Sequence, residues 1–279
     1  MKTGIIDVGG GLRGIYAAGV MDRLIDDRIT FDLGIGVSAG SANISTFIAG
    51  QRKRNYVFYT EYSQRKEYMS MKNIRSKGCY LDVQYIYGTL SNSDGEYPLD
   101  YNAYMKNPMD FIAVATNAIG GDVKYFAKTD MRRNYYNVLM ASSAIPYVCT
   151  PQEVDGTLYY DGALSDPVPI NKAFEMKCDK VVLVLTRPID DRRTPDEDII
   201  LAERIEPQYR LSAEALVGRA DKFNAGVDRA KELAKEGKVL IIAPQSTHGV
   251  KTLTKDIDAL NTLYESGYLD GGKIKDYLK

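Results

Sequence analysis

A serine that could act as a nucleophile stands in the middle of a five-residue motif that runs from Gly36 to Gly40, with Ser38 at its centre. An apolar run precedes this motif and a helical pattern follows it. Small residues around the serine permit the tight strand-to-helix turn that lifts a hydroxyl toward the positive end of a helix, as in nucleophile elbows. The same serine could instead serve only as the N-cap of the helix. The motif alone fits both interpretations.

A glycine-rich loop, GGGLRG, occupies residues 9–14 between a predicted strand and a predicted helix. Glycines let the backbone approach a ligand closely, and the positive end of a helix favours negative charge. The loop could therefore bind a phosphate or the oxyanion that develops during acyl transfer. The candidate groups are the amides of Gly9, Gly10 and Gly11 and the side chain of Arg13, with Gly14 completing the motif.

The same loop also matches the GxGxxG pattern of dinucleotide-binding proteins. Such a site needs an acidic residue at the end of the second strand. Asp32 has nearly the right spacing, but it begins the second predicted strand rather than ending it. We therefore favour the oxyanion interpretation, and the combination of this loop with the Ser38 motif favours catalysis over a simple helix cap.

A serine nucleophile needs a base, and Asp161 is the strongest candidate among the aspartates. It begins the triplet Asp161-Gly162-Ala163 at the end of a predicted short strand. Asp155 is followed by glycine in the signature of a tight hairpin turn, so we expect a turn residue there. Asp270 begins a similar triplet, but it lies between two short helical segments, as expected of a cap or loop.

The single histidine, His248, offers an alternative base. The order Ser38, Asp161, His248 matches the order of a catalytic triad in α/β-hydrolases. Those enzymes place several strands before the nucleophile, whereas here only one strand precedes the strand that leads to Ser38. We favour a Ser-Asp dyad and keep the triad as an alternative. The dyad predicts no activity limb from imidazole near about pH 6.5.

Short apolar runs alternate with helical patterns along the chain, which indicates an α/β layered fold. Several runs are almost continuously apolar, as expected of strands buried on both faces of a mainly parallel sheet. The predicted strands cover residues 3–8, 31–37, 111–116, 180–186 and 238–243. The predicted helices cover residues 15–26, 39–49, 171–176, 198–217, 222–235 and 255–266.

We expect a catalytic domain over residues 1–190 and a mostly helical C-terminal subdomain over residues 191–279. Residues 52–104 interrupt the alternation and are interpreted as an inserted cap. Its first half, residues 52–77, carries eight basic residues against two acidic ones, and ten of the 21 tyrosines lie in the insertion. This surface could contact anionic membrane lipids, or it could be a solvated helix face whose tyrosines cover the core. We favour the second interpretation.

The composition is that of an ordinary globular protein, with 44% hydrophobic and 26% charged residues. A formal net charge of −1 argues against nucleic acid as a partner. The chain has no long apolar stretch, so we expect a cytoplasmic protein with peripheral membrane contact at most. Cys79, Cys149 and Cys178 are odd in number and lack metal-site spacing, so we expect reduced thiols, and neither a metal site nor a cofactor.

The three motifs, in this order, resemble those of the patatin-like phospholipase family. Residues 141–146 ahead of Asp161 and residues 164–188 after it add to the resemblance, which covers residues 3 to about 188. Val8 departs from the pattern, because many family members carry an acidic residue at this place.

The resemblance implies a layered patatin-like fold and a dyad in which Ser38 attacks a lipid acyl ester while Asp161 accepts its proton. Water would then hydrolyse the acyl-enzyme, as in a phospholipase A or a lysophospholipase. A carboxylate is a weak base for a hydroxyl, so burial must raise its basicity and the oxyanion must be stabilised. An acyltransferase and a non-catalytic lipid-binding module remain alternatives. The sequence does not specify the head group, the acyl-chain length or the oligomeric state.

Overall fold

A single eight-stranded mixed sheet forms the centre of the computed structural model, which describes all residues from Met1 to Lys279. Its strands are β1 (Thr3–Asp7), β2 (Leu33–Val37), β3 (Asp110–Asn117), β4 (Val123–Ala127), β5 (Gln152–Val154), β6 (Thr157–Asp161), β7 (Lys180–Val184) and β8 (Val239–Ile242). Their order is β5-β6-β3-β2-β1-β7-β8, with β4 paired to β3 outside this path. The strands β3, β2, β1, β7 and β8 pair in parallel, and β4, β5 and β6 pair antiparallel.

The five strands predicted from apolar runs are all present in the sheet. The central strands β1, β2 and β7 are buried along almost their whole length, which explains their continuous apolar character. The predicted hairpin turn is also confirmed, because Asp155 and Gly156 join β5 to β6 with φ values of 46° and 82°. Strand β4 was not predicted. It lies at an edge, only Phe126 in it is buried, and its polar residues hide the strand pattern.

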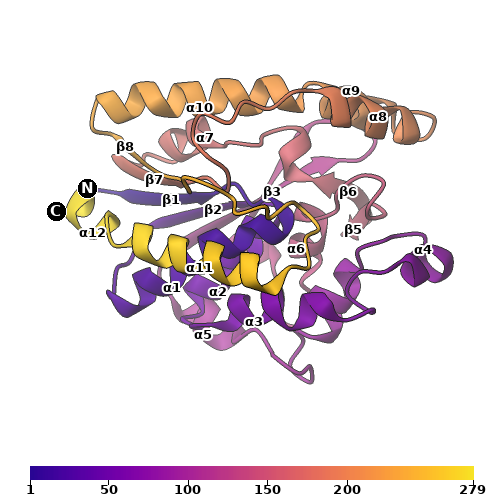
Figure 1. The fold of residues 1–279 in the computed structure, drawn as a ribbon, viewed down its shortest axis with the longest axis horizontal. Coiled ribbons are helices and arrows are strands. Elements are labelled where there is room, and N and C mark those ends of the chain that lie inside the picture. The colour runs from indigo at the N-terminus through magenta and orange to yellow at the C-terminus, as the bar shows by residue number, and fades with distance from the viewer.

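Helices cover both faces of the sheet and give the molecule three layers (Figure 1). The helices are α1 (Ile15–Asp26), α2 (Ala39–Ile48), α3 (Arg54–Thr60), α4 (Met71–Lys77), α5 (Tyr101–Lys106), α6 (Asn137–Ser142), α7 (Ile170–Glu175), α8 (Asp196–Ile205), α9 (Arg210–Val217), α10 (Arg219–Lys235), α11 (Ile257–Gly271) and α12 (Ile274–Leu278). Helices α7 and α10 cover one face, while α1, α2 and α11 cover the other, where α3 and α5 of the insertion also lie.

The C-terminal part shares these layers with the rest of the chain. It is mostly helical, as predicted, but it also supplies β8, which pairs with β7 at the end of the sheet. Its helix α10 buries Phe223 and Val227 against one face of the sheet, and α11 buries Leu260 and Tyr264 on the other. Residues 191–279 are therefore integrated into all three layers.

The prediction of one helix over residues 198–217 is wrong, because the structure has two helices, α8 and α9, in this region. Pro207 lies in the gap between them. Proline has no backbone N–H to donate to the preceding turn, so the helix cannot continue through Pro207 and α8 ends at Ile205. The insertion follows the prediction more closely, since it contains only short helices between β2 and β3.

Helices α1 and α11 cross at very short distance because each has a glycine at the crossing. A Cβ atom on Gly19 would collide with the carbonyl oxygen of Tyr264. A Cβ atom on Gly267 would collide with the carbonyl oxygen of Tyr16, and the carbonyl carbon lies 2.8 Å from the same position. The backbones themselves are therefore in contact, and the two glycines allow α11 to pack directly against α1.

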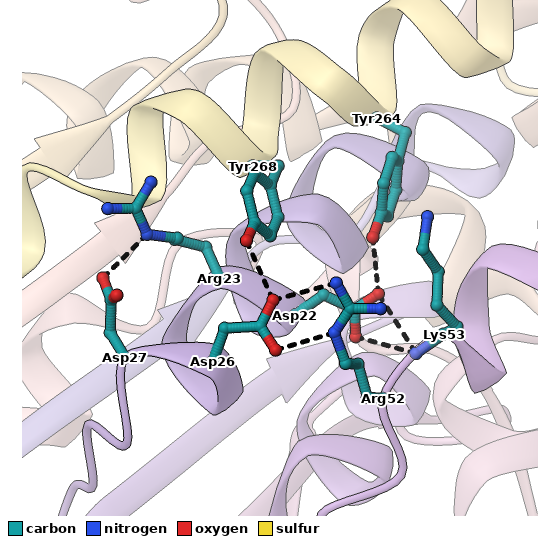
Figure 2. A network of polar contacts seen from close by, with 8 residues as sticks. All are labelled: Asp22, Arg23, Asp26, Asp27, Arg52, Lys53, Tyr264 and Tyr268. Atoms are coloured by element: carbon teal, nitrogen blue, oxygen red, sulfur yellow. Dashed lines mark hydrogen bonds and ion pairs between the residues drawn. The ribbon is translucent and has the colours of Figure 1, made fainter.

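Charged and tyrosine side chains add a polar network to the same junction (Figure 2). Asp22 of α1 accepts hydrogen bonds from the Tyr264 hydroxyl at 2.7 Å and from the Lys53 amide at 3.0 Å. Asp26 forms a two-bond ion pair with Arg52 at 2.7 and 2.9 Å. The Lys53 ammonium lies 4.0 Å from the centre of the Tyr264 ring. Arg52 and Lys53, the first basic residues of the insertion, are thus engaged in contacts within the fold.

We expect Gly267→Ala to destabilise the fold, because the added methyl group meets backbone atoms that cannot move without separating α1 from α11. The free energy of unfolding should fall by roughly 2 kcal/mol or more, despite the higher helix propensity of alanine. Gly218→Ala is the matched control, since the nearest atom to its Cβ position lies 3.7 Å away. Urea denaturation measures both, and equal stability of the two variants would contradict the tight crossing.

Candidate active site

One edge of β3 brings the candidate nucleophile and the candidate base together. Strand β2 pairs with β3 up to Val37, which lies opposite Val114. Strand β6 pairs with the next part of β3, and Asp161 lies opposite Ala115. Strand β4 pairs with β3 over residues 112–116, so it occupies the other edge and leaves β2 and β6 on the same one. The ends of β2 and β6 therefore meet, one residue apart along β3.

Ser38 stands in the turn between β2 and α2 with a backbone conformation that is rare for a residue with a side chain. Its φ is 57° and its ψ is −134°, in the region that favours glycine. Its side chain makes no capping hydrogen bond to α2, which contradicts the simple N-cap interpretation. The Ser38 amide donates instead to the Ser142 hydroxyl at 3.1 Å. The turn has the strain expected of a nucleophile elbow.

The neighbouring small residues leave room for this turn. A Cβ atom on Gly36 would collide with the backbone of Ser41, and one on Gly40 would collide with the carbonyl oxygen of Asp7. Gly14 faces the Tyr59 hydroxyl in the same way. Larger residues would therefore push α1, α2 and the serine turn apart.

Asp161 lies at the end of β6 and is 2% exposed. Burial raises the pKa of its carboxyl group to about 6, although the Ala163 amide and the Ser38 hydroxyl favour the charged form. The Ala163 amide donates to Oδ1 at 2.8 Å, so it orients the carboxylate. Gly162 is required between them, because a Cβ atom there would collide with the Val114 carbonyl oxygen. Asp161 is thus a stronger base than an exposed aspartate.

The glycine loop wraps against the serine turn. Gly9, Gly10 and Gly11 have φ values of 66°, 128° and 59°, all in the region that side chains avoid. A Cβ atom on Gly9 would collide with the Val37 carbonyl oxygen, so the loop lies directly against the residue before Ser38. The Gly9 amide is engaged with a carboxylate, whereas the amides of Gly10 and Gly11 donate no hydrogen bond within the chain.

Residues from late in the chain hold the glycine loop from its other side. The Leu12 amide donates to the Thr252 carbonyl oxygen at 2.9 Å. A hydrogen bond from the Thr186 hydroxyl reaches the Gly9 carbonyl oxygen. The loop is therefore fixed between the serine turn on one side and segments that follow β7 and β8 on the other.

Asp7 is a site residue that sequence reasoning missed. It is fully buried at the end of β1, where its carboxylate accepts from the Gly9 amide and from the Asn43 amide group, both at 2.8 Å. Burial raises its pKa to about 6. Many family members carry an acidic residue at the position of Val8. In this chain Asp7, one position earlier, supplies the carboxylate that holds the glycine loop. An acidic residue inside the apolar run before the glycines was the signal.

Arg13 extends from the glycine loop without any hydrogen-bond partner in the chain. It is half-buried, and its Nε atom is buried and unpaired. Burial lowers the pKa of its guanidinium group to about 10, and the nearby Arg187 and Arg193 contribute in the same direction. The side chain lines the same cavity as Ser38 and Asp161, so it presents an unneutralised positive charge to this cavity.

Two cavities of different character meet at Ser38. An apolar pocket of about 50 Å³ extends toward the insertion, where Phe58, Tyr59, Leu81 and Ile86 line it. A polar cavity of about 260 Å³ extends toward the C-terminal part. Besides Ser38, both cavities are lined by Gly11, Ile145, Thr252 and Leu253. A molecule with an apolar and a polar end could therefore place its centre at the serine.

The competing candidates lie elsewhere. His248 is exposed in a turn after β8, lines neither cavity, and its ring makes no hydrogen bond to Ser38 or Asp161. Asp155 is exposed in the hairpin turn and pairs with an arginine. Asp270 lies in the last turn of α11, where it accepts a hydrogen bond from the Tyr16 hydroxyl at 2.8 Å. The triad geometry is therefore not assembled.

Much of the basic stretch over residues 52–77 is engaged within the fold. Arg54 is 5% exposed and donates to the Ser91 hydroxyl at 2.8 Å, and Arg65 pairs with Glu96 at 2.7 Å. Half of the ten tyrosines in the insertion are buried, which favours the interpretation that they cover the core. No helix of the chain combines the length and the apolar character needed to cross a bilayer.

The three cysteines are free and buried, as predicted. No group of three or more histidine, cysteine, aspartate or glutamate side chains is arranged to hold a metal ion. The polar atoms at the site are thus backbone amides, hydroxyls, carboxylates and guanidinium groups.

Comparison with known proteins agrees with the motif order and with the layers described above. Residues 8–174 match the family model of the patatin-like phospholipases. The chain belongs to the patatin-like phospholipase family. A second model, for a domain of unknown function (DUF6363), matches residues 209–279.

The chain is also similar to individual proteins that are longer than it is. It is 27% identical to the uncharacterized protein YjjU of Escherichia coli over 70% of this chain and 54% of YjjU. It is 26% identical to Lysophospholipase NTE1 of Cryptococcus neoformans over 70% of this chain and 12% of that protein. The chain thus spans about half or less of these relatives. The structure of VipD from Legionella pneumophila matches with a TM-score of 0.52 at 13% identity, covering 99% of this chain and 67% of VipD, which supports the fold.

We expect Asp161→Asn to stabilise the protein at high pH. The folded pKa of about 6 lies above the unfolded value of 3.8, so the cost of the charged form is fully present above pH 6 and disappears as the pH falls toward 4. The gain should be on the order of 2 kcal/mol at about pH 8 and should shrink toward zero near about pH 4. Denaturant unfolding at both pH values measures it.

Asp155→Asn is the matched control for this change, because Asp155 also precedes a glycine but is exposed in a turn. Its stability should differ little from that of the unchanged protein at either pH. A destabilised Asp161→Asn variant at pH 8 would contradict a buried carboxylate that is costly to ionise.

Proposed function

We propose that this chain hydrolyses acyl esters of lipids through a dyad of Ser38 and Asp161. The observation that carries the proposal is the junction on the β3 edge, where a strained serine turn ends next to a buried carboxylate of raised pKa. Membership of the patatin-like phospholipase family supports the same activity. The lysophospholipase name of one relative agrees with a lipid ester as substrate.

In the first step, Asp161 accepts the Ser38 proton while the serine oxygen attacks the ester carbonyl carbon. The negative charge that develops on the carbonyl oxygen needs preorganised donors. The free amides of Gly10 and Gly11 can supply them, with the positive charge of Arg13 nearby. The Gly9 amide is already bonded to Asp7, so it shapes the loop instead of donating to the oxyanion.

Collapse of this intermediate expels the alcohol, which takes the proton from Asp161 and leaves the acyl group on Ser38. In the second step, Asp161 removes a proton from a water molecule that attacks the acyl-enzyme. Release of the fatty acid returns the serine to its protonated form and the aspartate to its charged form. One carboxylate therefore serves both half-reactions, in which it acts as a general base and then as a general acid.

The two cavities suit an amphipathic ester. The apolar pocket beside Ser38 is lined mainly by aromatic and aliphatic side chains, which fits the proximal part of an acyl chain. The polar cavity on the other side fits the alcohol portion. Contact with a membrane surface would involve α4, where Met71 and Ile74 are exposed beside Lys72 and Arg75. This segment combines apolar and basic side chains as interfacial segments do.

We expect Ser38→Ala and Asp161→Asn each to lower ester hydrolysis by at least about a thousandfold, because each removes one half of the dyad. His248→Ala should keep most of the activity, since the histidine lines neither cavity. Hydrolysis of a p-nitrophenyl ester and labelling with a fluorophosphonate probe measure both effects.

Each other outcome of this experiment has a clear meaning. Loss of activity in His248→Ala would support the triad instead of the dyad. An unlabelled unchanged protein would point to a non-catalytic lipid-binding module. Transfer of the acyl group to an added alcohol in preference to water would identify an acyltransferase.

We also expect the rate to fall on acidification through about pH 6, because Asp161 must be charged to act as a base and burial raises its pKa to about 6. The expectation that imidazole contributes no limb near about pH 6.5 remains a prediction, because this limb comes from a carboxylate. Asp7, whose pKa is also about 6, adds to the same limb. The pH profile of kcat/KM for His248→Ala should keep this limb, and its disappearance would assign it to the histidine.

A further inference from the structure

Four arginines from three separate segments line the polar cavity beside Ser38. Arg13 comes from the glycine loop, Arg187 and Arg193 come from the segment after β7, and Arg219 begins α10. The aromatic ring of Phe223 lies 5.8 Å from the guanidinium carbons of both Arg187 and Arg193. Arginine stacks on aromatic rings, so this contact holds the two guanidinium groups in place.

These arginines have fewer carboxylate partners than their charges require. Asp198, which is 1% exposed, accepts from Arg219 Nε at 2.9 Å and also lies 3.5 Å from Arg193, so two cations share one carboxylate. Arg187 has one partner, the half-exposed Asp191, at 3.2 Å. The Nε atom of Arg193 is buried without a partner.

Two positive charges of the cavity lining therefore have no carboxylate partner of their own. Asp191 and Asp198 offset two of the four guanidinium groups, which leaves Arg13 and one charge of the Arg193 and Arg219 pair. The carboxylates of the lining itself, those of Asp161 and Glu197, form no ion pair with these arginines. Burial and the neighbouring arginines lower the pKa of Arg193 to about 10, which reflects the same crowding. Unpaired buried charge is costly, and an anion that enters the cavity would reduce this cost.

We propose that this arginine-lined cavity binds the phosphate of a lipid head group that carries no compensating cation. The proposal rests on the proposed function, since it places the alcohol portion of the same ester in this cavity. With the acyl chain in the apolar pocket and the ester carbonyl at Ser38, the rest of the molecule extends into the polar cavity. Guanidinium groups bind phosphate oxygens through paired hydrogen bonds.

The shape and charge of the cavity favour a compact anionic head group over the common zwitterionic ones. A cavity of about 260 Å³ accommodates a glycerol phosphate. A choline or ethanolamine group would bring a further cation among four arginines and would remove the net negative charge that draws the ligand in. The preferred substrates are therefore single-chain anionic lipids such as acyl glycerol 3-phosphate and lysophosphatidylglycerol.

The test compares kcat/KM for four single-chain esters: acyl glycerol 3-phosphate, lysophosphatidylglycerol, lysophosphatidylcholine and neutral monoacylglycerol. Arg193→Gln removes the buried guanidinium with the unpaired Nε. Arg192→Gln is the matched control, because this neighbour carries the same charge but pairs with Asp228 at the surface, at 2.6 Å. Arg187→Gln serves as a second variant, and thermal unfolding checks that each protein is folded.

The unchanged protein should prefer the two anionic esters, and Arg193→Gln should lower the ratio of anionic to neutral turnover by about tenfold or more. Arg193 also lowers the pKa of Asp161, and loss of this effect changes the turnover of every ester equally. The ratio of anionic to neutral turnover therefore reports on the head group alone. Arg192→Gln should leave the ratio within about twofold. Equal turnover of all four esters by the unchanged protein, or an unaltered ratio in both cavity variants, would overturn the proposal.

Calorimetry with sn-glycerol 3-phosphate, inorganic phosphate and glycerol tests binding without catalysis. We expect glycerol 3-phosphate to bind the unchanged protein and the Arg192→Gln variant, and to bind Arg193→Gln at least about tenfold more weakly. Tighter binding of inorganic phosphate than of glycerol 3-phosphate would assign the cavity to a free anion and contradict a head-group site. Binding of glycerol 3-phosphate by a protein without esterase activity would overturn the dyad mechanism alone.

Discussion

The candidate site depends on how two strands share one edge of β3. Strand β2 runs parallel to β3 and ends at Val37, and the antiparallel β6 ends opposite the next residue, so the two chain ends meet from opposite directions. Because register in a sheet is set by backbone hydrogen bonds, the separation of Ser38 from Asp161 is determined by the sheet and not by flexible loops. The strained serine turn and the tight approach of Gly162 to β3 are consequences of this arrangement.

Burial of charge gives the site its chemical properties. Asp7 and Asp161 lie inside the molecule at the ends of β1 and β6, and both have raised pKa values because water is excluded from them. One carboxylate organises the glycine loop and the other faces the serine, so burial of charge affects both the loop and the basicity of the proposed dyad. Four arginines line the same cavity as Asp161 and add positive charge beside this carboxylate.

The sequence predicted the central strands and the helices α1, α2, α7, α10 and α11, because apolar runs and helical periodicity can be recognised within one segment. It also placed the three motifs together. It did not predict β4, whose pattern is weak at an exposed edge, or the break at Pro207. Asp7 was missed because its role depends on a partner, Asn43, that is distant in sequence. The arginines of the C-terminal part belong to no recognisable sequence motif. Only the fold brings Arg193 and Arg219 to the cavity beside the serine.

The bond between Leu12 and Thr252 has a consequence for how the protein is made. Ser38 leaves the ribosome well before the segment that completes the wall of its pocket, because that segment is translated more than 200 residues later. The segment after β8 must dock before the glycine loop acquires this outer support. A nascent chain therefore carries Ser38 without its finished surroundings until that segment has been made and has folded onto the sheet.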